Sequence, residues 1–121
     1  MKCQGSFSSD ELQVIKEGNL LRIFFDLTPA KDEENEVIEG MYDCENVDVD
    51  SMQYGDIVSA IIRSRYTQDT VEAILSNYEE AKDATSDLAQ EKREEYSDEY
   101  TDYQNWRKHA KDIARQVSDL L

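Results

Sequence analysis

The chain has 121 residues, and its 28 acidic side chains outnumber the 13 basic ones, which gives a formal net charge of −15. A chain of this length usually forms one domain, so we expect residues 1–121 to fold as a single unit. The negative charge repels phosphate backbones and anionic membranes, which argues against direct binding to either. No apolar run approaches the roughly 18 residues of a membrane-spanning helix, and the first residues lack the apolar stretch of a signal peptide.

Residues 1–50 are predicted to form mostly strands. Two apolar runs, residues 12–16 and 20–27, flank Gly18-Asn19, a pair suited to a tight hairpin because both residues tolerate positive φ. Residues 28–35 contain the only proline and several charges, and they are predicted to form an exposed loop. A third strand from Glu36 to about Val49, with Gly40 as a candidate bulge, completes a three-stranded antiparallel meander.

Residues 51–121 are predicted to form mostly helices, because the apolar period changes at Ser51 to that of an amphipathic helix. One stripe contains Tyr54, Ile57, Val58, Ile61 and Ile62. Ser51 is the predicted cap of this helix, and Thr67 is the predicted cap of a second helix after a tight corner. The apolar face of the second helix contains Val71, Ile74, Leu75 and Tyr78.

A long third helix is predicted from about Glu91 to Leu120. Its heptad-spaced apolar seam contains Tyr96, Tyr103, Ala110 and Val117, together with Trp106, Ile113 and Leu120. Such a seam can pack within the monomer or join two copies, so a homo-oligomer through this helix stays open. Before the seam, residues 79–95 form a charged segment whose order the composition leaves open. The expected fold is therefore α+β, a small three-stranded antiparallel meander followed by three helices, the last one long.

Chemistry-bearing residues are few. His109, the only histidine, falls off the main seam on a helical wheel, and we expect it on the surface. No nucleophile signature, glycine-rich phosphate loop or zinc spacing occurs. A calcium loop starting at Asp48 lacks both the glycine and the final glutamate that such loops need. We therefore expect no enzyme activity, no catalytic residue, no cofactor and no metal site. An enzyme would need a pocket that gathers His109 with several carboxylates.

The two cysteines, Cys3 and Cys44, are expected to be free thiols of a cytosolic protein. A disulfide between them would require the N-terminal segment to lie beside the strand that contains Cys44. The sequence leaves their redox state open.

Two segments carry a family resemblance. Residues 54–69 lead into residues 71–78 as a helix pair, and residues 99–111 close the chain with Tyr103, Trp106 and Arg107 at a characteristic spacing. Together they resemble small uncharacterised proteins encoded by phages and prophages of Bacteroides-type gut bacteria, in the prophage structural or tail region. The resemblance covers about half of the chain and carries no catalytic residues. It implies a role in virion assembly, in the bacterial host cytoplasm or incorporated in the particle.

The expected function is a non-enzymatic protein–protein interaction in virion structure or assembly, with phage structural or assembly proteins as partners. Aromatic side chains are enriched at interfaces, because an apolar body and a polar tip both find contacts there. Four on the last helix are the predicted partner contacts: Tyr96, Tyr100, Tyr103 and Trp106. The alternative is an acidic regulator or inhibitor that mimics nucleic acid against a basic host protein.

Overall fold

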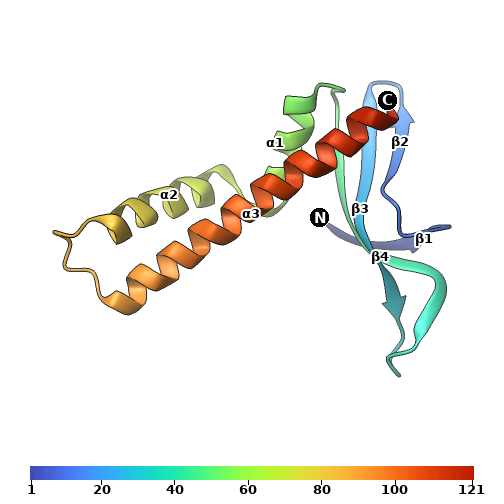
Figure 1. The fold of residues 1–121 in the computed structure, drawn as a ribbon. Coiled ribbons are helices and arrows are strands. Elements are labelled where there is room, and N and C mark those ends of the chain that lie inside the picture. The colour runs from blue at the N-terminus through green and yellow to red at the C-terminus, as the bar shows by residue number, and fades with distance from the viewer.

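The structure, a computed structural model, describes all residues 1–121 and has an α+β fold, as the sequence predicts (Figure 1). The strands are β1 (Lys2–Ser6), β2 (Gln13–Glu17), β3 (Leu20–Lys31) and β4 (Val37–Val49). The helices are α1 (Tyr54–Arg65), α2 (Gln68–Lys82) and α3 (Gln90–Leu120). The strands form one antiparallel sheet in the order β1-β4-β3-β2. No helix has both the length and the apolar character needed to cross a membrane.

The sheet has four strands, so the prediction of three is wrong by one. The additional strand is β1, which pairs with β4 at the edge of the sheet. Its sequence, Lys-Cys-Gln-Gly-Ser, has no alternation of apolar and polar residues and includes a glycine, which weakens a strand on its own. Its place depends on pairing with a strand some 40 residues away in the chain, which local pattern does not reveal.

The β2–β3 hairpin is confirmed at the predicted turn. Glu17 pairs with Leu20, which leaves Gly18 and Asn19 as the two turn residues. Gly18 has a φ of +61°, whereas Asn19 is not in the positive-φ region. A two-residue turn with positive φ at its first position alone is a type II′ turn, which matches the twist of the flanking strands.

The predicted loop at residues 28–35 is wrong in its first half, because β3 continues to Lys31. Pro29 is tolerated there because β2 pairs with β3 only as far as Phe24, so this part of β3 is an edge that needs no donor from Pro29. The turn itself is built on Asp32, whose carboxylate accepts the N–H groups of Glu34 and Glu36 at 2.9 and 3.0 Å.

Two irregularities bend the β3–β4 pair. Gly40, with a φ of +77°, lies where the register shifts between Pro29 and Lys31, so the predicted bulge is confirmed. A second shift falls between Phe25 and Thr28 and includes Asp26, whose φ is +53°. Aspartate tolerates this left-handed conformation better than most residues, and a bulge redirects the side chains around it.

The core lies where α1 and the C-terminal half of α3 cover one face of the sheet. Its residues are Leu21, Ile23, Phe25, Val49, Ile57, Ile61, Trp106, Ala110, Ile113, Ala114 and Val117. From Tyr103 to Val117 the seam of α3 therefore packs within the chain, whereas Tyr96 is half-buried and Leu120 is 62% exposed. The predicted cap Thr67 is confirmed by its bond from the Thr70 N–H at 3.2 Å. Ser51 is not the cap of α1, because the helix begins at Tyr54 after Gln53.

Away from the sheet, α2 and the N-terminal half of α3 lie side by side and project from the rest of the molecule (Figure 1). We call this antiparallel pair, residues 68–102, the helical arm. Only one residue of α2, Ile74, is buried. Leu75, predicted on the same apolar face, is 42% exposed. The arm is thus a projecting element with a thin core.

Candidate functional site

The four predicted partner contacts divide into two buried and two half-buried residues. Tyr103 is 7% exposed and Trp106 is 5% exposed, and both belong to the interior of the protein. Tyr96 and Tyr100 are half-buried and lie on the arm. The prediction that Tyr103 and Trp106 dock a partner conflicts with their burial, because side chains with so little exposed surface offer a partner almost no contact area. Tyr96 and Tyr100 remain accessible for that role.

Trp106 is held by contacts within the chain. Its indole Nε1–H donates to the Ile61 carbonyl oxygen at 3.2 Å, and the Arg65 guanidinium lies 3.6 Å from the ring centroid. The ring of Phe25 lies 6.2 Å away in a tilted arrangement. A cation over an indole face and a satisfied indole donor are both stabilising. Trp106 therefore joins α1, α3 and the sheet.

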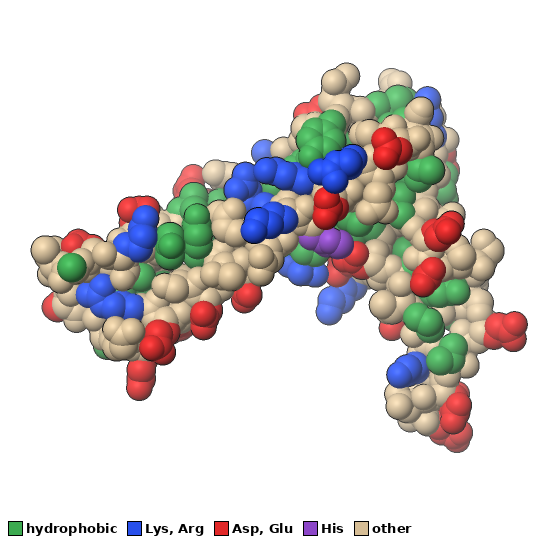
Figure 2. Space-filling model, in the orientation of Figure 1, with side chains coloured by type: hydrophobic (Ala, Val, Ile, Leu, Met, Phe, Trp, Pro, Cys, Tyr) green, Lys and Arg blue, Asp and Glu red, His purple; other side chains and the backbone are tan.

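The arm presents half-buried aromatic rings. Tyr100 on α3 stacks on Tyr78 of α2, with ring centroids 3.8 Å apart and an interplanar angle of 3°. Lys82 Nζ lies 4.9 Å from the Tyr78 centroid, and Lys92 Nζ lies 5.8 Å from that of Tyr96. The stack of Tyr78 and Tyr100 joins the two helices. Tyr78, Tyr96 and Tyr100 are all half-buried, so part of each ring is accessible. Hydrophobic side chains reach the surface of the arm in Figure 2.

The arm is also strongly acidic. Residues 68–102 carry 12 acidic and 3 basic side chains. Lys82 pairs with Glu79 and Lys92 pairs with Glu95, each at 3.0 Å. Hydrogen bonding to these glutamates raises the pKa of Lys82 and of Lys92. The remaining carboxylates have few cations nearby, so the arm presents a negative field to solvent.

His109 has a partner that the helical wheel did not predict. Its Nε2 lies 2.7 and 2.9 Å from the two carboxylate oxygens of Asp26, and its ring lies against Phe25 and Trp106. The side chain is 38% exposed, so the expected surface position is only partly right. The pairing arises because the β3 bulge brings Asp26 to the side of the sheet that α3 covers. A wheel describes one helix and contains no information on the strand beside it.

An open groove of about 650 Å³ lies next to this pair, between α3 and the segment that precedes β2. It is lined by Asp10, Glu11, Leu12, Asp26, Leu27, His109, Ile113, Gln116, Asp119 and Leu120. This is the gathering of His109 with several carboxylates that the enzymatic alternative requires. The lining contains no hydroxyl, thiol or amine, the usual nucleophiles besides carboxylates. Nowhere in the chain do three or more His, Cys, Asp or Glu side chains lie close enough together to hold a metal ion.

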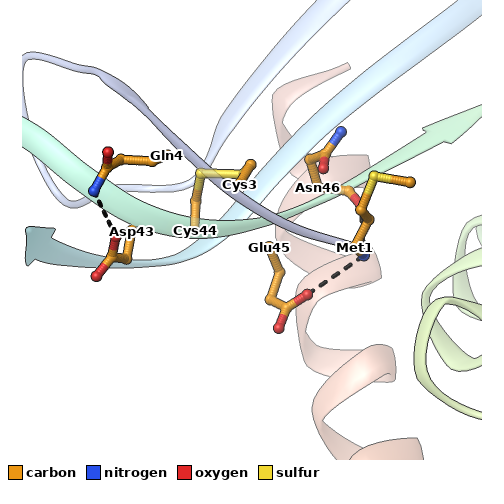
Figure 3. Close-up of a disulfide and its surroundings, with 7 residues drawn as sticks. All are labelled: Met1, Cys3, Gln4, Asp43, Cys44, Glu45 and Asn46. Carbon is orange, nitrogen blue, oxygen red and sulfur yellow. Dashed lines mark hydrogen bonds and ion pairs between the residues drawn. A yellow bond between two sulfur atoms is a disulfide. The ribbon is translucent and has the colours of Figure 1, made fainter.

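Cys3 and Cys44 form a disulfide, so the expectation of two free thiols is wrong (Figure 3). The two residues are direct partners in the β1–β4 register, with Cα atoms 5.0 Å apart. On one side of the bond, Gln4 Nε2 donates to Asp43 at 3.0 Å. On the other side, the Met1 amino group lies 3.4 Å from Glu45. The N-terminal segment lies beside the Cys44 strand, which is the arrangement that a disulfide requires.

The fold and these sites define the chain only at the level of its class: an α+β protein with a four-stranded antiparallel sheet, two covering helices and a projecting helical arm. In comparisons with protein families, with curated proteins and with solved structures, nothing matched the chain.

Proposed function

We propose that this protein is a non-enzymatic phage or prophage protein that acts by protein–protein interaction in the structure or assembly of the virion, around the tail. The observation that carries the interaction is the helical arm, which projects from the sheet and holds accessible aromatic surface at Tyr96 and Tyr100. The phage origin rests on the resemblance of residues 54–78 and 99–111 to prophage-encoded proteins. The partners are phage structural or assembly proteins.

The thin core of the arm supports this role. Two antiparallel helices gain most of their stability from burying apolar faces, yet α2 buries one residue and leaves Leu75 42% exposed. Apolar and aromatic side chains that the monomer leaves accessible are the material from which interface centres are made. A partner that covers this surface would complete the burial.

The disulfide supports the proposal that the protein leaves the reducing cytosol as part of a virion. Disulfides are rare in reducing compartments and persist in oxidising ones. A virion protein is made in the bacterial host cytoplasm and meets oxidising surroundings after release. The Cys3–Cys44 bond would then form on a sheet whose pairing already brings the two residues together.

The test is capture of virion proteins from a host that expresses the neighbouring phage genes. The full chain should retain a virion or assembly protein, and Tyr96→Ser/Tyr100→Ser should reduce its recovery by about tenfold or more, as loss of interface anchors does. Tyr54→Ser is the matched control, because Tyr54 is 43% exposed on α1, outside the arm. Circular dichroism should show all variants folded. Capture that fails with the wild-type chain, or that the double variant leaves unchanged, would contradict the proposal.

The charge of the arm favours a second candidate, an acidic inhibitor that occupies a nucleic-acid groove of a basic host protein. Its 12 acidic and 3 basic side chains form the negative field that such a mimic needs. A complex of this kind would weaken steeply as salt rises and would be displaced by competing DNA. Capture of a host nucleic-acid-binding protein with these two properties, in place of a virion protein, would select this candidate over the first.

A further inference from the structure

We propose that the groove beside the Asp26–His109 pair, which we call the α3 groove, binds a basic and apolar peptide segment of a partner protein. The inference rests on the proposed function only in taking the partner to be a protein. It concerns a different surface from the arm, at the opposite end of α3. Its volume of about 650 Å³ falls within the range of roughly 300–1,000 Å³ that is usual for binding pockets.

The groove has an apolar floor and one apolar side chain left open at its edge. Leu27 is 7% exposed and Ile113 is 5% exposed, so they form part of the core that lies beneath the groove. Leu120 is 62% exposed although it belongs to the apolar seam of α3. A partner's aliphatic side chain placed here would cover Leu120, which burial of apolar surface favours.

The charges around this floor select the occupant. The lining includes no lysine or arginine but has four carboxylates: Asp10, Glu11, Asp26 and Asp119. Asp26 is satisfied by His109, whereas the carboxylates of the other three make no hydrogen bond or ion pair within the chain. Three unpaired carboxylates around an apolar floor are complementary to lysine or arginine side chains that flank an apolar residue.

The groove lacks basic side chains even though the part of α3 beside it is rich in them. Its C-terminal half carries Arg107, Lys108, Lys111 and Arg115. None of these four lines the groove, and Arg115 instead pairs with Asp112 at 3.0 Å. The side of α3 that lines the groove is the stripe of His109, Ile113, Gln116 and Leu120, with Asp119 beside it. The helix thus directs its basic residues to other faces, which leaves the groove lined by carboxylates without a lysine or an arginine.

The test measures binding of the full chain to a fluorescein-labelled pentapeptide of alternating Lys and Leu by fluorescence anisotropy. Asp10→Asn/Glu11→Gln/Asp119→Asn should raise the Kd by about tenfold or more. The matched control Glu33→Gln/Glu34→Gln/Glu39→Gln removes the same charge from the exposed β3–β4 connection and the exposed start of β4 and should change the Kd by less than about twofold. A Lys/Ser peptide of the same charge should bind about tenfold more weakly, because it offers no apolar side chains.

Three results would overturn the assignment. Equal effects of the two triple variants would show that total charge alone attracts the peptide. Equal binding of the Lys/Leu and Lys/Ser peptides would show that the floor takes no part. A dimer in light scattering that Leu120→Glu dissociates would show that a second copy of the chain occupies the groove. If the peptide binds as expected but no virion protein is captured, the proposed function fails and the groove stands; the reverse pair of results overturns only the groove.

Discussion

At the scale of single residues, Trp106 has the most consequential surroundings, because contacts from β3 and α1 meet on its ring. The indole donates to the Ile61 carbonyl, and Arg65 lies over its face. Arg65 also pairs with Glu45 of β4 at 3.5 Å. One side chain therefore links two helices to the sheet, and its substitution should destabilise the packing of α1, α3 and the sheet against one another.

Trp106→Ala should lower the free energy of unfolding by about 3–5 kcal/mol, because it removes a buried ring and leaves a cavity. Trp106→Phe should cost less, since it retains most of the packing and loses the indole N–H. Urea denaturation followed by circular dichroism measures both. If the Trp106→Ala protein were as stable as the wild type but unable to capture its partner, Trp106 would be an interface anchor and not a core residue.

Asp83, in the segment between α2 and α3, makes the stability of the protein depend on pH. Its carboxylate accepts the Thr85 hydroxyl at 2.7 Å and the Thr85 N–H at 2.9 Å, and these bonds, with a smaller attraction from Arg93, lower its pKa. A carboxyl whose pKa is lower in the folded state stabilises the fold above its unfolded pKa. That contribution is lost as the pH falls through the lower, folded value.

Thr85→Val removes the hydroxyl donor, so we expect the pKa of Asp83 to rise toward the ordinary carboxyl value. NMR titration of the side-chain carboxyl carbon measures it. The stability difference between the variant and the wild type should be present at neutral pH and disappear at pH values below the folded pKa. Thr101→Val is the control, because the Thr101 hydroxyl donates to the Ser97 carbonyl and not to a carboxylate. Identical Asp83 titrations in the two variants would refute the assignment.

At the scale of elements, the turn between α2 and α3 is organised by one arginine. The Arg93 guanidinium donates to four backbone carbonyl oxygens, those of Ala81, Asp83, Ser86 and Leu88, at 2.7–3.1 Å. Carbonyls at the end of a helix have no partner within the helix, and a basic side chain can satisfy them. Arg93 thereby closes the far end of the arm, within the charged segment 79–95.

Arg93→Met keeps much of the apolar stem and removes every donor, so the carbonyls must find water. We expect the arm to lose about 1.5–3 kcal/mol of local stability, the usual contribution of hydrogen bonds to a charged group. Hydrogen exchange should accelerate across residues 79–95 and stay unchanged in the sheet. Arg115→Met is the control, because Arg115 makes only an exposed pair with Asp112. Equal protection of the arm in both variants would show that Arg93 does not close it.

At the scale of the whole molecule, the disulfide connects the two ends of the sheet-forming half. Cys3 and Cys44 are separated by 41 residues, and the bond crosses from the edge strand β1 to β4. A crosslink across a loop of this length restricts the unfolded chain, which stabilises the folded state by about 4 kcal/mol in the chain-entropy description. The strand that depends most on this bond is the short β1.

Reduction with dithiothreitol should therefore lower the Tm of the wild-type protein, and Cys3→Ala should lower it by a similar amount. The reductant should have no further effect on Cys3→Ala, which separates loss of the bond from any other action of the reagent. Calorimetry measures both. A wild-type Tm that is indifferent to the reductant would mean that β1 is held by its backbone pairing alone.

The order of elements was predictable because periodicity is a local property of the chain. The hairpin at Gly18-Asn19, the cap at Thr67 and the length of α3 follow from residues close together in sequence. The same holds for the bulge at Gly40, whose φ of +77° few other residues adopt easily. The end of β3 was not predictable from Pro29, because a proline breaks a strand or sits at its edge according to which neighbour the strand has.

The candidate sites depended on the tertiary structure. The pattern of α3 places Tyr103 and Trp106 on one seam, but only packing against α1 and the sheet shows that this seam is interior. Likewise, the pairing of Asp26 with His109 joins residues 83 positions apart, through a bulge that no local motif announces. Sequence by itself determined three of the four strands, the helices and the charge, since these arise from neighbouring residues. Tertiary structure alone decided β1, the disulfide and the α3 groove, because each is made by segments that meet only after the chain has folded.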